Sequence, residues 1–177
     1  DVTSSYSAGS ANGPGAILNA LHQVDLFDPF VKDAWKLGLF MKPVSKLWLK
    51  RNEKYREKAE NYITALEKGN STFFQQSLNS VNKKCEELKI WVQEETKALL
   101  DDNKLVVLLG GDHSTPLGYI QALAEKHEKF SVLQIDAHAD LRVNYEDFEH
   151  SHASIMHNVL TSCPGVLLTQ VGVRDFC

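Results

Sequence analysis

The stretch from Leu133 to Asp140 constrains this chain most, because an apolar run ends there in residue types that bind metals. Asp136, His138 and Asp140 follow the run at alternate positions. Side chains alternate along an extended chain, so we expect all three to project from one face. Carboxylates combined with imidazole suit a borderline divalent cation. The alternative is a solvated strand end whose polar residues bind nothing.

A second motif strengthens the metal hypothesis. Residues 105–109 are strongly apolar and predict a buried strand, Gly110 and Gly111 predict a turn, and Pro116 suits the first position of a helix. His113 therefore follows the carboxyl end of one strand, as the first motif follows the next. Ligands bind at this edge of open α/β sheets, so we expect His113 to lie near the carboxylates.

Together the two motifs resemble the paired signature of a known family. Residues 110–114 spell Gly-Gly-Asp-His-Ser and residues 136–140 spell Asp-Ala-His-Ala-Asp. This pair is similar to the signature of the ureohydrolases, which include arginase, agmatinase and formimidoylglutamase. The resemblance implies a three-layer α/β/α domain with a mainly parallel sheet. It also implies a binuclear hydrolase that uses two manganese ions and water to cleave a C–N bond of a linear guanidino or amidine compound.

The resemblance also implies a role for each polar residue of the motifs. Asp136 would bridge the two ions, and His138 would bind one of them. His113 and Asp140 would complete the other, and Asp140 would also accept a proton from the attacking water. Asp112 would orient the turn from behind the ligands, although a plain capping role is the alternative.

A later histidine is the candidate for proton transfer to the leaving amine. His152 resembles the family's shuttle histidine, would contact the substrate, and has a side chain that titrates near neutral pH. The family usually has glycine after this histidine, where this chain has Ala153. His150 competes for the role, because in an extended segment it would point the same way.

Arg142 bears on the substrate. Arginase places a short amide two residues after the last ligand to hold the amino-acid carboxylate, and this chain has Arg142 there. The pattern looks more like agmatinases, so we expect Arg142 to contact the substrate and agmatine to be cleaved to putrescine and urea. An arginine binds carboxylates well, which leaves arginase or formimidoylglutamase activity open.

Composition excludes several other classes. The chain has 177 residues, 43% of them hydrophobic and 24% charged, which suits one globular core. A formal net charge of −4 gives no reason to expect nucleic-acid binding. No apolar run approaches the roughly 20 residues of a membrane span. The three cysteines are too far apart for a thiolate zinc site. We therefore expect a cytoplasmic protein with no nucleic-acid or membrane partner. The family resemblance, in turn, implies an enzyme with a small-molecule substrate and a trimeric or hexameric assembly.

The remaining pattern concerns domain organisation. Apolar residues at steps of three and four predict helices before and after Gly69, and 166–173 predicts a further strand. Compared with arginase, 31–100 looks like a largely helical insertion. The family's first strand would precede Asp1 and its Asp-x-Asp ligand pair would follow Cys177, so we expect a single ureohydrolase domain over 1–177, truncated at both ends.

Two other hypotheses remain at this stage. The chain could be a non-catalytic half-site that acts as an interaction module and binds one ion or none. Metal-dependent deacetylases are similar in fold and use one zinc ion, but they lack the histidine of the Gly-Gly-Asp-His motif.

Overall fold

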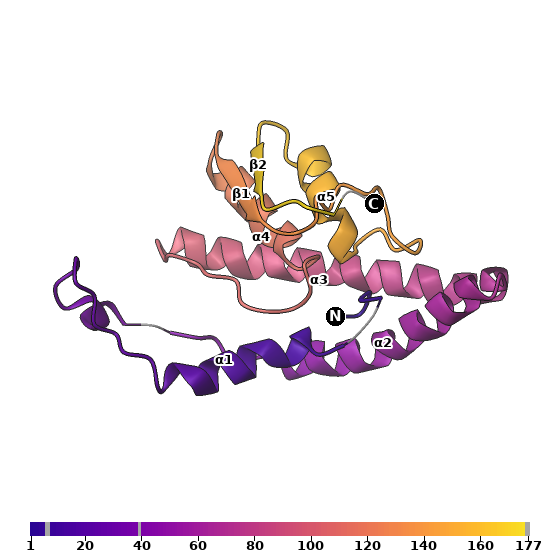
Figure 1. Cartoon of the computed structure of the whole chain (residues 1–177), viewed down its shortest axis with the longest axis horizontal. Coiled ribbons are helices and arrows are strands. Elements are labelled where there is room, and N and C mark those ends of the chain that lie inside the picture. Colours follow the sequence, from indigo (N-terminus) through magenta and orange to yellow (C-terminus); the bar gives the residue numbers. More distant parts are fainter. Residues whose placement is uncertain (6–7, 39, 176–177) are drawn as a thin grey trace.

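Helices dominate the computed structural model, which describes residues 1–5, 8–38 and 40–175 (Figure 1). The helices are α1 (Gly13–Leu21), α2 (Lys46–Glu67), α3 (Gln75–Asp101), α4 (Pro116–Lys126) and α5 (Ile155–Ser162). The strands are β1 (Ser131–Ile135) and β2 (Leu167–Val171). Short 3-10 turns lie at Ser10–Asn12, Ala34–Leu37, Ser71–Phe74 and His152–Ser154. Of the described helices, none is long and apolar enough to cross a membrane.

The two strands form a parallel pair, with α5 in the connection between them. Ser131 pairs with Leu167 and Ile135 with Val171. One face of the pair packs on α4 and α5 through an apolar cluster that contains Leu117, Ile120, Ile155, Met156 and Val159, with Val132 and Leu168 from the strands. This arrangement confirms the expected α/β fold with a parallel sheet.

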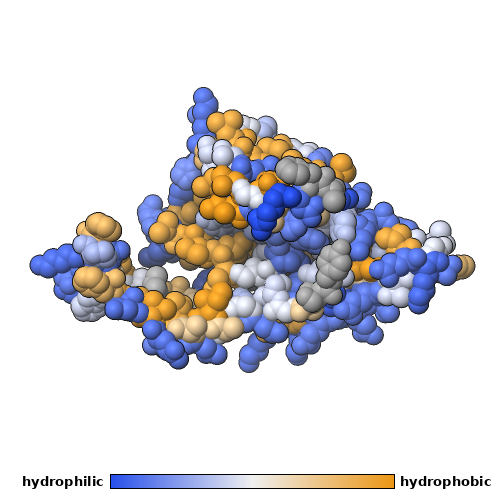
Figure 2. Space-filling view, in the orientation of Figure 1, coloured by the Kyte–Doolittle hydropathy of each residue, from blue (hydrophilic) through white to orange (hydrophobic). Residues whose placement is uncertain are grey.

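The other face of the sheet is open among the described residues. Its apolar side chains are 51–77% exposed, namely those of Leu133, Ile135, Leu167 and Val171. Helices α4 and α5 therefore supply one layer over the sheet, and a second layer is not seen in this part of the chain. Figure 2 shows apolar residues gathered at the top of the molecule, where the strands lie in Figure 1, and again along α1.

Helices α2 and α3 form a long antiparallel hairpin below the sheet (Figure 1). Ala59, Tyr62 and Ile63 of α2 pack against Leu78 and Val81 of α3, all at most 7% exposed. These positions recur at helical spacing, so the expected helices before and after Gly69 are confirmed. The hairpin falls within 31–100 except for its last residue, and the status of that region as an insertion stays a prediction.

Helix α4 joins the hairpin to the sheet through a close approach at Gly118. A Cβ atom at this position would lie 2.2 Å from the carbonyl oxygen of Lys89 on α3. Only glycine allows the two helix backbones to come this close. The long helix α3 therefore supports the layer that covers the strands.

The strand expected at 105–109 is not formed. Residues 104–110 have no assigned secondary structure, and Leu105 and Val107 are 96% and 80% exposed. A strand exists only within a hydrogen-bonded ladder, and the structure records no strand pairing between this segment and any described residue. Tyr119 Oη of α4 donates a hydrogen bond of 3.0 Å to the carbonyl oxygen of Val106, which ties the segment to α4.

Two of the three cysteines lie within the described residues. Cys85 and Cys163 are free thiols. Cys177 lies outside the described residues.

Candidate metal centre

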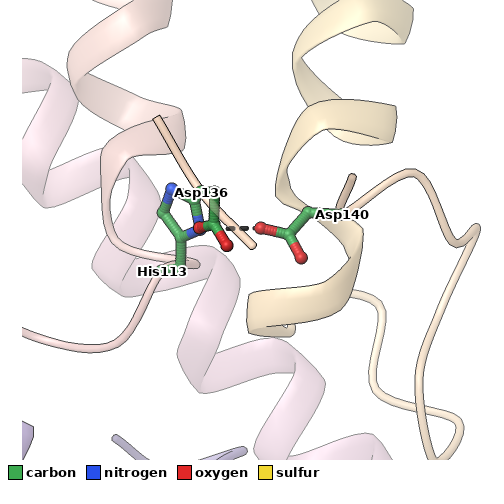
Figure 3. A group of neighbouring side chains, drawn as sticks. All are labelled: His113, Asp136 and Asp140. Atoms are coloured by element: carbon green, nitrogen blue, oxygen red, sulfur yellow. Dashed lines mark ion pairs between the residues drawn. The ribbon is translucent and has the colours of Figure 1, made fainter. Parts of the chain in front are cut away.

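His113, Asp136 and Asp140 converge at the carboxyl end of β1 (Figure 3). His113 Nδ1 lies 2.7 Å from Asp140 Oδ2 and 3.2 Å from Asp136 Oδ2. One ligand atom from each residue lies within 4.8 Å of the others. The residues come from the turn before α4, the end of β1 and the segment before α5. The two motifs thus meet at the sheet edge where the sequence places them.

The glycine turn brings His113 to this edge. Gly110 and Gly111 have φ of +94° and +75°, a region that L side chains rarely adopt. A Cβ atom at Gly111 would lie 2.2 Å from Thr115 Oγ1. Asp112 Oδ1 accepts a hydrogen bond of 2.8 Å from the Ser114 N–H, which stabilises the polar tip of the turn. Asp112 therefore acts here as a turn residue close to His113.

Asp140 owes its position to an unusual backbone conformation. Its φ of +52° lies in the left-handed region, which aspartate tolerates better than most residues. Its carbonyl oxygen accepts the N–H groups of Met156 and His157 at 3.0 and 3.3 Å, in the first turn of α5. Its side chain is buried, with Oδ2 accepting a hydrogen bond of 3.1 Å from Gln134 Nε2. The ligand loop is therefore fixed to both β1 and α5.

Asp136 lies between two imidazoles and offers one oxygen to each. Its Oδ2 faces His113, whereas its Oδ1 lies 3.2 Å from His138 Nδ1 and accepts the His138 N–H at 2.8 Å. His138 itself is 62% exposed at the side chain and lies outside the group of three. Strand β1 ends at Ile135, and an isolated parallel bridge pairs His138 with Asp175 beyond it.

The charges of the group are of a kind that could hold a cation. A hydrogen bond to Asp140 raises the pKa of His113, against the opposing effect of burial. Burial favours the neutral form of Asp136, but the His138 N–H and the nearby imidazoles outweigh it and lower the Asp136 pKa. Both shifts reflect the attraction between the carboxylates and a positive charge at His113. A divalent ion would take the place of that positive charge, since metal ligands bind in their deprotonated forms.

His152 and Arg142 meet at a residue that the sequence did not highlight. The ring of Tyr145 lies 5.6 Å from the His152 ring and 5.2 Å from the Arg142 guanidinium. His152 Nδ1 is buried and has no hydrogen-bond partner among the described residues. The structure records no hydrogen bond or ion pair between His152 and the three-residue group within the described chain. Both candidates therefore contact Tyr145.

His150 is directed toward the helical hairpin. Its Nε2 lies 3.0 Å from Glu86 Oε2 on α3, and burial lowers the pKa of its imidazole. The competing proton-transfer candidate is thus engaged with a carboxylate on α3.

The hairpin also holds the turn before these histidines, which the sequence did not indicate. Tyr62 Oη of α2 donates a hydrogen bond of 2.7 Å to Asp147 Oδ2. Burial, with the Asp147 carboxylate, raises the pKa of Tyr62 to about 12, so the hydroxyl remains a donor. Phe148 is fully buried and its ring centroid lies 5.7 Å from that of Tyr62. The only sequence signal for this contact is an isolated phenylalanine in a polar stretch.

An α/β protein with imidazole and carboxylate groups converging at the end of a parallel strand has the features of a metal-dependent enzyme domain. The sequence model of the arginase family matches residues 1–177, and the chain belongs to this family.

Individual relatives share the family but are longer. N(1)-aminopropylagmatine ureohydrolase of Thermus thermophilus is 43% identical over 90 residues, which cover 51% of this chain and 30% of the relative. The Synechocystis protein of the same name is 28% identical over 180 residues, covering 100% of this chain and 49% of the relative. Agmatinase of Bacillus cereus is 34% identical over 68 residues, which cover 38% and 23% of the two chains. The chain spans about half the length of the Synechocystis relative and less of the others. No solved structure matches it.

Proposed function

We propose that the protein is a manganese-dependent ureohydrolase, and that this chain contributes part of its binuclear site. The convergence of His113, Asp136 and Asp140 is the observation that carries the proposal. Imidazole nitrogen and carboxylate oxygen together suit a borderline divalent ion such as manganese. The raised pKa of His113 fits the same view, because the metal-free group already attracts positive charge.

In this proposal each ligand has a distinct task. Asp136 would be shared by the two ions, as the family resemblance implies. Its Oδ2 lies near His113 Nδ1 and its Oδ1 near His138 Nδ1, which fits this role. His113 and Asp140 would complete one ion, and His138 would serve the other. Bound manganese would supply Lewis-acid activation of water at neutral pH.

The chain's own residues would handle the protons. Asp140 would accept a proton at its carboxylate, which is already aimed at the group by Gln134. His152 would donate a proton to the leaving amine, since an imidazole can carry a proton near neutral pH. Tyr145 would hold the His152 ring by its edge-to-face contact.

The substrate class we propose is a guanidino compound with an amine tail, with agmatine as the leading candidate. Relatives named agmatinase and N(1)-aminopropylagmatine ureohydrolase support this choice. Arg142 favours a second candidate, a carboxylate-bearing substrate such as arginine or formimidoylglutamate, because a guanidinium binds carboxylates. Cytoplasmic location and assembly into trimers or hexamers belong to the same proposal and follow from the family resemblance.

Metal stoichiometry after manganese loading and desalting tests the proposal first. We expect His113→Ala to weaken manganese binding, and His127→Ala to leave it unchanged, because His127 is exposed at the end of α4. His152→Ala should keep the metal and slow urea release from agmatine. A chain that binds no manganese would support the non-catalytic half-site instead.

A substrate screen then decides between the candidates. Urea release is compared for agmatine, N(1)-aminopropylagmatine and arginine, and ammonia or formamide release for formimidoylglutamate. With Arg142→Ala, activity on an amine-tailed substrate should be largely kept if the first candidate is right. If the protein prefers a carboxylate-bearing substrate and Arg142→Ala loses that activity, the second candidate substrate would be established.

A further inference from the structure

Two glutamines face each other across the strands, directly behind the candidate metal centre. Gln134 of β1 and Gln170 of β2 are partners in the parallel register, and Gln134 is only 4% exposed. The neighbouring positions on this face hold Val132 and Leu168, which pack under α4 and α5. An amide in such surroundings destabilises the fold unless its polar atoms are paired. We therefore expect the polar atoms of both amides to have hydrogen-bond partners.

Every amide hydrogen of the pair has an acceptor. Gln170 Nε2 donates to the carbonyl oxygen of Ala139 at 2.7 Å and to Gln134 Oε1 at 2.6 Å. Gln134 Nε2 donates to the carbonyl oxygen of His138 at 3.3 Å and to Asp140 Oδ2 at 3.1 Å. A side-chain amide carries two N–H donors, so both glutamines use all of theirs.

The network also fixes which way each amide faces. A carbonyl oxygen can only accept, so Ala139 requires the nitrogen of Gln170 to point toward the ligand loop. That nitrogen then requires the oxygen of Gln134 on its other side. The nitrogen of Gln134 is left to face Asp140, whose carboxylate could not accept from an oxygen.

All four bonds act on the segment that carries the candidate ligands, either directly or through the other glutamine. The carbonyl oxygens of residues 138 and 139 and the carboxylate of Asp140 are the acceptors outside the pair. Asp140 Oδ2 is also the oxygen that lies 2.7 Å from His113 Nδ1. The hydrogen bonds of the pair thus hold Asp140 Oδ2 toward His113 and stabilise the left-handed backbone at Asp140.

We propose that Gln134 and Gln170 are positioning residues that hold the loop 138–140 and aim Asp140 at the metal. Gln134 acts on Asp140 directly, and Gln170 acts by orienting the Gln134 amide and by binding the Ala139 carbonyl. The inference has two halves. The metal half, that the pair aims Asp140 at the metal, rests on the proposed function. The loop half, that the pair holds the loop 138–140, concerns the metal-free chain.

Manganese affinity tests the metal half. Gln134→Leu keeps a similar side-chain volume and removes both donors, and we expect manganese to bind about 10–100-fold more weakly. Binding is followed by the EPR signal of free manganese during titration. Gln93→Leu is the matched control, because it removes a 2.7 Å amide-to-carboxylate bond that joins α3 to Glu125 of α4 and does not involve the loop. Val132→Ala, on the same face of β1, controls for a loss of stability without a polar change.

A second substitution tests the linkage between the glutamines. Gln170→Leu alone should also weaken manganese binding. In the double variant the loss should be smaller than the product of the two single losses, because part of the Gln170 effect passes through Gln134. Independent, fully multiplicative losses would overturn this part of the proposal.

Hydrogen exchange tests the loop half without metal. The N–H groups of Met156 and His157 donate to the Asp140 carbonyl, so their exchange reports on the loop. We expect faster exchange at both in Gln134→Leu and in Gln170→Leu, and wild-type exchange in Gln93→Leu. If the wild-type chain binds no manganese, the proposed function fails, and exchange alone decides on the positioning pair. Unchanged exchange in both variants, or unchanged manganese affinity in a chain that binds it, overturns the inference.

Discussion

Phe148→Ala should be the most destabilising single change in the loop that precedes His152. Phe148 is fully buried and packs on the cluster formed by α2 and α3, with its ring 5.7 Å from that of Tyr62. Truncating a buried phenylalanine to alanine costs about 3–5 kcal/mol. Of this, about 0.5–1.5 kcal/mol reflects the loss of the aromatic pair beyond simple burial.

The local backbone explains why the loop depends on this anchor. Glu146 and Asp147 have φ of +51° and +62°, a pair of left-handed residues in a tight turn closed by Tyr145 and Phe148. Neither is glycine, so the turn is strained and needs external support. The buried ring and the bond from Tyr62 Oη to Asp147 supply it.

Urea denaturation followed by circular dichroism measures the effect as a change in the free energy of unfolding. Phe73→Ala is the matched control, because it makes the same chemical change at a side chain that is 85% exposed. We expect the control to stay within about 0.5 kcal/mol of wild type. If Phe148→Ala also lost less than about 1 kcal/mol, the reasoning that this ring anchors the loop to the hairpin would be refuted.

Two further predictions concern packing and pH. Gly118→Ala should lower the free energy of unfolding by about 1–3 kcal/mol, because the added methyl group would clash with the Lys89 carbonyl oxygen. Thermal unfolding measures this effect, and an unchanged melting temperature would contradict the close approach of α3 and α4. Burial lowers the pKa of His150 in the folded state, so the unfolded chain takes up a proton first as pH falls below about 6.5. Stability should therefore decline on acidification through this range. His150→Gln should make that decline shallower in denaturation at stepped pH, and an equal or steeper decline would count against a buried, neutral imidazole.

The sequence predicted the long helices and the candidate metal centre correctly, but it predicted one strand that is not formed. Helices α2 and α3 followed from apolar spacing, because a stripe at steps of three and four can be buried only by a helix. His113, Asp136 and Asp140 were predicted to meet because both motifs follow runs that end at one sheet edge. The strand expected at 105–109 was wrong, since an apolar run signals burial but pairing depends on a partner strand.

Only the tertiary structure decided the contacts between segments that are far apart in sequence. Gln134 reaches Gln170 through strand register, and Phe148 reaches Tyr62 because a helical hairpin lies beneath the loop. Residue types and spacing give local conformation and the chemistry that each side chain can perform. Spatial neighbours depend on how the elements pack. The sequence alone therefore determined an α/β chain of the arginase family with a candidate metal centre, whereas packing decided how the candidate ligands are held.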